Sequence, residues 1–177
     1  MTAVIQLKTM LDLIIIISLL IVLALTLYAY LLGTAPVPTP AAVVPAMIAA
    51  AAIKPGDKVY DLGCGDGRLV FAAAAAGAQA TGLEISPLIF VWAYLRKIFK
   101  KSPAKILFRD MLTADISSAQ IIFLYMYPTT NRLFLKNKFQ KQLAPGTKVI
   151  SLAFPVKGLP LQKTLRAGRH YIFVYQL

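Results

Sequence analysis

A loop with three glycines at alternate positions is the part of this sequence best suited to chemistry. Gly63, Gly65 and Gly67 follow a short apolar run containing Asp61, and an alanine-rich run comes next. Because glycine has no Cβ, such a loop can turn sharply and let a ligand lie against its backbone. The helix that follows directs free N–H groups and its positive dipole end at that ligand. A dinucleotide fingerprint needs a further glycine where this chain has Arg68, so the loop predicts a different small molecule.

Carboxylates stand at the ends of three predicted strands. These are Asp61, Glu84 and Asp110, in a chain with only seven acidic residues. The carboxyl ends of parallel strands meet at one edge of an open α/β sheet, where ligands bind. Glu84 comes 23 residues after Asp61, close to the ~20-residue separation typical of an acid that holds ribose hydroxyls. Isolated acids at strand ends are often only turn formers, but three at three such ends indicate a ligand site.

The D-x-G-x-G-x-G spacing from Asp61 to Gly67 resembles motif I of class I S-adenosylmethionine (SAM) methyltransferases. Other segments resemble small bacterial members of this class, similar to the mitochondrial, membrane-anchored protein-lysine methyltransferases. They are V-P-T-P, K-P-G-D-K-V-Y-D-L-G-C-G-D-G-R, F-R-D-M, L-Y-M-Y-P and L-A-P-G-T-K-V-I-S, at residues 37–40, 54–68, 108–111, 124–128 and 143–151. The resemblance covers nearly all of the chain from residue 36 onward.

This resemblance implies a SAM site and assigns residues to it. The set expected to bind SAM is Asp61, Gly63, Cys64, Gly65, Gly67, Glu84, Asp110 and Met111, with Thr39 and Pro40 closing over it. Glu84 is expected to accept from the ribose hydroxyls, Asp110 from the adenine amino group, and Asp61 to orient the methionine end. Tyr125 and Tyr127 are expected to line the acceptor pocket, although aromatics at a strand end equally often pack in a core. No metal site is expected, since the chain has one cysteine and one histidine.

The acceptor is left open between several molecules. The resemblance favours a protein lysine amine, whose deprotonation an apolar aromatic pocket assists. The alternatives are a phospholipid head-group amine and a non-catalytic SAM-binding partner subunit. A nucleic acid is disfavoured: enzymes that methylate base amino groups usually carry Asn/Asp-Pro-Pro-aromatic, and this chain has Tyr-Met-Tyr-Pro at 125–128. The family often has acidic residues after the fifth strand, where this chain has Phe-Pro-Val-Lys at 154–157.

Strands alternate with helices along the chain from residue 41. Strands are predicted at 58–62, 79–83, 104–108, 119–125 and 147–153, with a hairpin at 161–167 and 170–176; helices are predicted at 41–53, 67–76, 87–101 and 131–143. Such alternation indicates a parallel, doubly wound sheet with right-handed crossovers. We therefore expect an α/β, Rossmann-like seven-stranded sheet of the class I methyltransferase type, with a terminal antiparallel hairpin.

A twenty-residue uncharged run at 13–32 accounts for much of the mean hydropathy of +0.69. At ~1.5 Å per residue it can cross a ~30 Å bilayer core, whereas signal-peptide cores are usually ~7–15 residues. We expect an N-terminal segment 1–32 with one transmembrane helix, a proline-rich linker 33–40 and a catalytic domain 41–177. That domain and linker carry 18 basic and 6 acidic residues, which favours a single-pass protein with its domain on the cytoplasmic side, in a bacterial inner membrane.

The helix predicted at 87–101 carries two candidate stripes. Leu88, Val91, Leu95 and Ile98 are expected to face the core at helical spacing. Phe90, Tyr94, Lys97 and Lys101 form a second stripe, suited either to an anionic lipid surface or to ordinary solvent.

Overall fold

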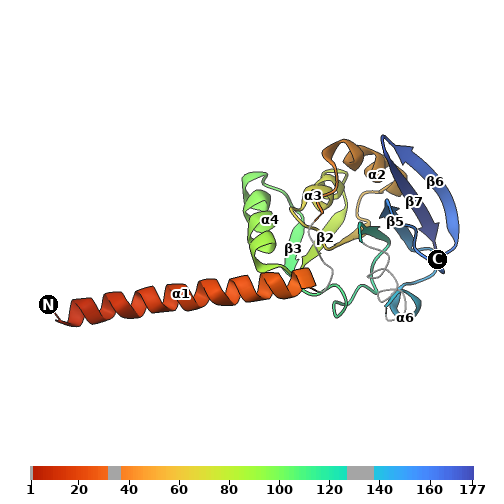
Figure 1. Ribbon diagram of the computed structural model, residues 1–177. Helices are drawn as coiled ribbons and strands as arrows, with labels where there is room; N and C mark the ends of the chain where they lie inside the picture. Colours follow the sequence, from red (N-terminus) through yellow and green to blue (C-terminus); the bar gives the residue numbers. More distant parts are fainter. Residues whose placement is uncertain (1, 32–36, 127–137) are drawn as a thin grey trace.

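The computed structural model describes residues 2–31, 37–126 and 138–177. One α/β domain is built on a single sheet, and a long N-terminal helix projects from it (Figure 1).

Seven strands form this sheet in the order β3-β2-β1-β4-β5-β7-β6. They are β1 (Lys58–Leu62), β2 (Gln79–Glu84), β3 (Lys105–Phe108), β4 (Ile121–Leu124), β5 (Lys148–Leu152), β6 (Leu161–Ala167) and β7 (His170–Gln176). The first five are parallel, and β7 runs antiparallel between β5 and β6. The predicted sheet and terminal hairpin are confirmed. The edge strand β6 is largely exposed and has an irregular register between Leu161 and Lys163.

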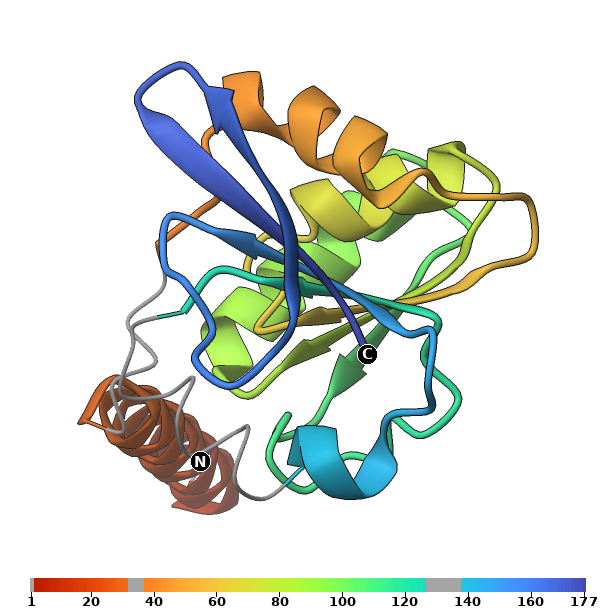
Figure 2. The same cartoon turned by 90° about the vertical axis from the view of Figure 1, so that its right-hand side faces the viewer.

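Helices and loops cover both faces of the sheet (Figure 2). On one face lie the 3-10 turn η1 (Ala41–Val43), α2 (Val44–Ala51), α3 (Arg68–Ala75) and α4 (Pro87–Phe99). Met47 of α2 and Val70 of α3 are fully buried there. On the other face the loop carrying Ile116 and the turn carrying Phe139 pack against β4 and β5. The predicted helix 131–143 lies mostly outside the described residues; its described end holds α6 (Gln140–Gln142).

Local sequence explains where the central elements begin and end. All four residues of β4 are buried, as expected for a parallel strand covered on both faces. Gly77 adopts φ +93°, ends α3 and turns the chain into β2. Pro87 opens α4 at its first turn, where a missing N–H costs nothing. Ser86 precedes it but makes no side-chain cap; its Oγ is buried without a hydrogen-bond partner among the described residues.

The core-facing stripe predicted for α4 is wrong, whereas in the second predicted stripe Tyr94 and Lys101 are exposed and Phe90 and Lys97 are partly buried. Leu88, Val91, Leu95 and Ile98, expected in the core, are all exposed, and Ala93 is the fully buried residue of this helix. Because α4 is apolar almost all round, periodicity alone does not select the face that packs. The small side chain of Ala93 lets the helix approach the sheet closely.

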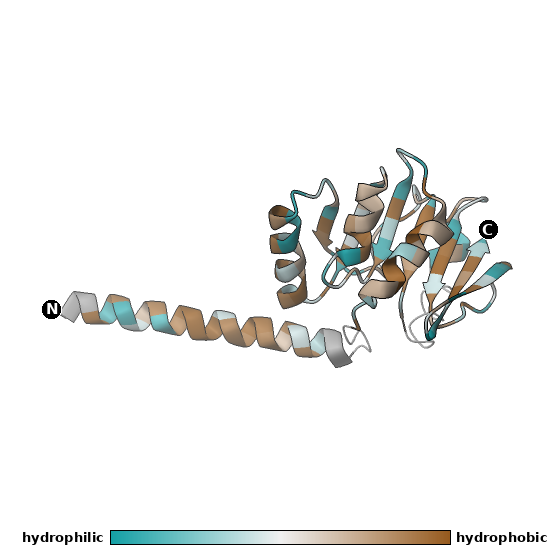
Figure 3. Ribbon diagram, turned by 90° about the horizontal axis from the view of Figure 1, so that it is seen from above, coloured by the Kyte–Doolittle hydropathy of each residue, from teal (hydrophilic) through white to brown (hydrophobic). Residues whose placement is uncertain are grey.

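Helix α1 (Thr2–Leu31) extends away from the domain (Figures 1 and 3). Its segment Ile5–Tyr28 is 24 residues long, has a mean hydropathy of 2.9 over an 18-residue window and is not buried within the protein. At ~1.5 Å per residue this segment is roughly 36 Å long, enough for a bilayer core of ~30 Å by length and composition. It begins earlier than the predicted span of 13–32.

Candidate active site

The glycine loop after β1 is fixed to the end of β2. The N–H groups of Gly63 and Cys64 both donate to the carbonyl of Leu83, each at 2.9 Å. Gly63 and Gly65 adopt φ values of +75° and +55°, which favour glycine. A Cβ built on either would meet no atom within 4 Å. The loop therefore presents bare backbone to open space, as the predicted ligand site requires.

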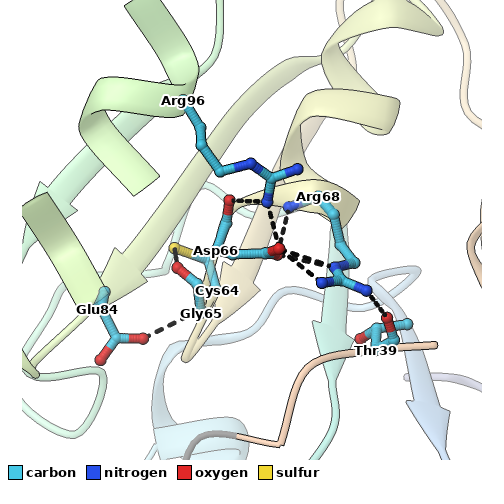
Figure 4. Close-up of polar contacts among 7 residues, drawn as sticks. All are labelled: Thr39, Cys64, Gly65, Asp66, Arg68, Glu84 and Arg96. Carbon is cyan, nitrogen blue, oxygen red and sulfur yellow. Dashed lines mark hydrogen bonds and ion pairs between the residues drawn. The ribbon is translucent and has the colours of Figure 1, made fainter. Parts of the chain in front are cut away.

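The buried carboxylate of Glu84, the last residue of β2, is hydrogen-bonded to the glycine loop. Its Oε2 accepts the N–H of Gly65 (3.0 Å), and its Oε1 accepts the N–H of Ser86 (2.8 Å). Figure 4 shows the carboxylate directed at Gly65. Burial raises the pKa of this carboxyl, while the backbone N–H groups of Ser86, Gly65 and Ile85 oppose the rise. Each carboxylate oxygen has a further lone pair for a ligand hydroxyl.

Asp61 lies below the loop, at the second-last position of β1. Only 6% of it is exposed. Burial, followed by the negative charges of Glu84 and Asp66, raises its pKa to about 7. A cationic ligand at this edge would relieve the repulsion among these carboxylates, because opposite charge favours the ionised form.

Stability should depend on pH through Asp61. Because its pKa is raised from 3.8 to about 7 on folding, the folded protein binds more protons than the unfolded chain within that window. The free energy of unfolding therefore falls as pH rises through it, by at most about 1.4 kcal/mol per pH unit for one proton. Glu84, whose pKa is also raised, adds a slope of the same sign.

Urea unfolding in detergent, measured at several pH values across this window, tests the assignment. Asp61→Asn should give a visibly shallower fall in unfolding free energy. Asp115→Asn is the control: Asp115 is exposed and its pKa is lowered, chiefly by the backbone N–H of Ser117, so the slope should persist. An unchanged slope in Asp61→Asn would contradict the role of Asp61.

Asp66 is the centre of an ion-pair cluster that the sequence reasoning missed. Its carboxylate accepts from Arg68 Nε (2.9 Å) and Nη2 (2.6 Å) and pairs with Arg96 (Figure 4). Arg96 Nη1 also donates to the Asp66 carbonyl (2.8 Å). Burial pushes the pKa of Asp66 upward, but hydrogen bonds from Arg68 and the charge of Arg96 outweigh it, so the pKa is lowered. The Asp-Gly-Arg order at 66–68 could have indicated the pair of Asp66 with Arg68. No sequence pattern indicated that Arg96, on α4, would join it.

Arg68 also connects the segment before α2 to the loop. Its Nη1 donates to the carbonyl of Thr39 (2.8 Å). Thr39 is buried, and Pro40 after it is partly exposed and accepts the N–H of Val43 (2.9 Å). Of the predicted covering pair, Thr39 is therefore tied to the residue that follows the glycine loop (Figure 4), and Pro40 comes next in the chain.

Asp110 reaches the same sheet edge through β3. The last residue of that strand, Phe108, pairs with Glu84, and the N–H of Arg109 donates to the Glu84 carbonyl (3.0 Å). One oxygen of Asp110 accepts the N–H of Leu112 (2.8 Å), so the residue also forms a turn. The Met111 side chain is buried in the core.

Cys64 fills the tight space between the loop and β2. A Cβ added to Gly82 of β2 would lie 2.7 Å from the Cys64 sulfur. Burial, with the nearby charges of Asp61 and Glu84, raises the pKa of this thiol well above its usual value. Its side chain is a packing group, and its backbone belongs to the loop.

Of the predicted acceptor residues, Tyr125 follows β4 and Tyr127 lies outside the described residues. Tyr125 is half-buried and stacks on Phe154, with ring centroids 6.4 Å apart. Phe154 follows β5, so the two rings stand at neighbouring strand ends. Within residues 2–31, 37–126 and 138–177 there is no group of three or more side chains suited to a metal ion.

The family described as "ANTKMT methyltransferase domain" matches residues 61–163, from the glycine loop to the start of the hairpin. This chain belongs to that family. A protein-lysine N-methyltransferase of Saccharolobus islandicus is 33% identical over 147 residues, which cover 78% of this chain and 91% of that protein. The adenine nucleotide translocase lysine N-methyltransferase of Mus musculus is 31% identical over 70% of this methyltransferase, which spans 55% of the mouse enzyme's length.

A solved structure agrees with this membership. The crystal structure of an RNA methyltransferase from Salinibacter ruber in complex with S-adenosyl-L-homocysteine matches with a TM-score of 0.71 and 34% identity. The match covers 79% of this methyltransferase and 93% of that chain. The present protein is thus a class I SAM-dependent methyltransferase, with SAM as its methyl donor, as the sequence predicts.

Proposed function

We propose that this protein is a membrane-anchored SAM-dependent methyltransferase whose acceptor is a lysine amine of a protein. The observation that carries the choice of acceptor is the similarity to the protein-lysine N-methyltransferase of Saccharolobus islandicus over most of both chains. The similarity to the mouse lysine methyltransferase, over part of that longer protein, supports the same acceptor.

The residues at the carboxyl edge fit SAM. Gly63 and Gly65 leave a cradle that a Cβ would enter, and Glu84 lies beneath it with both oxygens already oriented by backbone N–H groups. We assign SAM contacts to the full predicted set, namely Asp61, Gly63, Cys64, Gly65, Gly67, Glu84, Asp110, Met111, Thr39 and Pro40. When bound, SAM supplies a methyl group on a positively charged sulfur. Asp61 provides negative charge for its cationic methionine end.

The acceptor pocket is proposed at Tyr125, Phe154 and Tyr127. The stacked rings of Tyr125 and Phe154 give an apolar surface at the ends of β4 and β5. A lysine amine held there loses hydration, which lowers its pKa and favours the neutral nucleophile. The aromatic faces also suit an ammonium that already carries methyl groups. The remaining requirement is alignment of the nitrogen with the methyl group.

The anchor is proposed to be α1, with the domain on the cytoplasmic side of a bacterial inner membrane. The length and apolar composition of Ile5–Tyr28 support a span. The positive charge of the chain, +12 in total, favours the cytoplasmic side and attraction to anionic lipid.

A second candidate acceptor is RNA. The Salinibacter ruber RNA methyltransferase is 34% identical to this chain. In addition, a groove of about 450 Å³ between α3 and α4 is lined by Arg68, Arg96, Lys100 and Lys101. Two of these cations are already paired with Asp66, and the groove contains none of the assigned SAM residues, so we rank RNA second.

Labelled SAM distinguishes these acceptors. The purified full chain is incubated with labelled SAM and native membranes plus total RNA, and protein, lipid and RNA are then separated. Label on lysines of membrane proteins is the expected result. Label confined to RNA or to phospholipid amines would replace the lysine proposal. A complete lack of turnover, with SAM still bound, would instead indicate a non-catalytic partner subunit.

A further inference from the structure

Helix α4 exposes an unusually apolar outer face. Its members are Leu88, Val91, Trp92, Leu95, Ile98 and Phe99, with exposed fractions from 42% to 82%. Apolar patches of this extent on one element are uncommon on soluble monomers and mark a surface with a partner. We refer to these six residues as the α4 outer face.

The patch continues onto the edge of the sheet. Leu107 and Phe108 of β3, the edge strand beside α4, are exposed as well. Phe90, on the inner side of α4, bridges the two elements, because its ring lies 5.4 Å from that of Phe108. The apolar surface is therefore continuous across a helix and a strand.

Basic residues border this surface, and no acidic residue lies in the same stretch of the sequence. Lys100, Lys101, Lys105 and Arg109 are exposed, and Lys97 lies over the ring of Tyr94 at 5.8 Å. The sequence has no acidic residue between Glu84 and Asp110. An apolar helix face bordered by lysine, arginine and aromatic residues is the composition of helices that lie in a membrane interface. Each such cation near an anionic bilayer adds to the attraction between the protein and the membrane surface.

The position of α1 relates this surface of α4 to the bilayer that α1 is proposed to span. Helix α4 stands at the end of the domain from which α1 projects, and the two helices run crosswise in both views (Figures 1 and 3). They contact each other. A helix crosswise to a membrane-spanning helix, and next to its end, lies along the membrane surface. Figure 3 shows hydrophobic residues, in brown, along most of α1 and over much of α4.

We infer that the α4 outer face lies in the interface of the bilayer that α1 spans, as a second membrane contact of the catalytic domain. This inference rests on the proposed anchoring by α1. Glu84, at the end of β2, is separated from Pro87 at the start of α4 by two residues. Docking α4 therefore fixes the SAM-binding edge at a set height over the membrane, where a lysine of a membrane protein can reach it.

Trp92, the only tryptophan of the chain, reports directly on this face. The full chain is reconstituted into vesicles containing anionic lipid, and fluorescence is quenched either by brominated acyl chains or by acrylamide in the water. The inference predicts strong quenching by the brominated lipid and protection from acrylamide. Strong acrylamide quenching without lipid quenching would overturn it. Protection from both quenchers would also overturn it, because a second copy or another protein would then cover the face.

A second tryptophan position separates this inference from the anchor itself. In a Trp92→Phe background, Leu20→Trp places the only tryptophan within α1. Lipid quenching at position 20 but not at position 92 would leave the anchor standing and remove the α4 contact. Quenching at position 92 alone would show a lipid contact of α4 but remove the anchor, and with it the inference that α4 lies on a bilayer spanned by α1.

Two leucines with nearly equal exposure allow the same substitution to be compared on α4 and away from it. Leu88 on α4 and Leu161 on β6 are 55% and 54% exposed. Leu88→Glu should lower the quenching of Trp92 by lipid and shift its emission to longer wavelength. Leu161→Glu, the same change at the far edge of the sheet, should leave both signals unchanged. Equal effects of the two substitutions would contradict a specific contact by α4.

Discussion

Replacing Glu84 with alanine is expected to weaken SAM binding by roughly a hundredfold or more and to destabilise the domain. The N–H groups of Gly65 and Ser86 lose their acceptor in a buried place, and each such loss costs about 1–3 kcal/mol. The proposed hydrogen bonds from the ribose hydroxyls are lost as well, at about 1.5–3 kcal/mol each for bonds to a charged group. Titration calorimetry with SAM and urea unfolding in detergent measure the two effects separately.

Glu84→Gln and Asp115→Ala make this result specific. The glutamine keeps one acceptor oxygen but turns an NH₂ group toward a second N–H, so its losses should be intermediate. Asp115 accepts the N–H of Ser117 (2.9 Å), but it is exposed, and water replaces it at little cost. A folded Glu84→Ala protein with unchanged SAM affinity would show that the site lies elsewhere.

Removing the Asp66 carboxylate is expected to release the segment that covers the loop. Asp66→Ala leaves the partly buried guanidinium groups of Arg68 and Arg96 without their anion, at a cost of about 1–3 kcal/mol in unfolding free energy. The Arg68 guanidinium then lacks the carboxylate that orients it, and its hydrogen bond to the Thr39 carbonyl is weakened. SAM affinity should fall in parallel, because Thr39 and Pro40 are proposed to close over the ligand.

A double-mutant cycle tests this coupling. Asp66→Ala and Arg68→Ala should be strongly non-additive, with an interaction energy of about 0.5–3 kcal/mol. Arg166→Ala is the matched control, because Arg166 also donates to a nearby backbone carbonyl, that of Gly168 (3.1 Å), but is exposed and distant in the fold. Additive effects at positions 66 and 68 would mean that the pair does not act as one unit.

Much of this fold follows from local patterns in the sequence. The strands β1, β6 and β7 have the predicted bounds, because alternation and turn glycines determine where each begins and ends. The topology alone was enough to predict that Asp61, Glu84 and Asp110 share one edge of the sheet. Their strands, β1, β2 and β3, are parallel neighbours. A glycine loop before a helix then defined the rest of the site.

Other features depend on contacts that no local pattern contains. Arg96 meets Asp66 across thirty positions of sequence, from one helix to a loop. The outward direction of Leu88 and Val91 follows from the close approach of Ala93 to the sheet, not from the periodicity of α4. Ser86 has the residue type and position of a helix cap, yet its Oγ makes no cap bond, and its own N–H donates to Glu84. In each case tertiary packing overrides the local preference.

The irregular edge strand β6 has a consequence for how such molecules meet. Proteins held in a membrane by an anchor of the kind proposed for α1 share one orientation and collide in two dimensions, so equivalent sheet edges meet repeatedly. The break in register between Leu161 and Lys163, together with the exposed charges of Lys163 and Arg166, interrupts the row of backbone groups that another sheet would extend. Copies brought together by such an anchor would therefore find no regular strand edge on β6 to pair with.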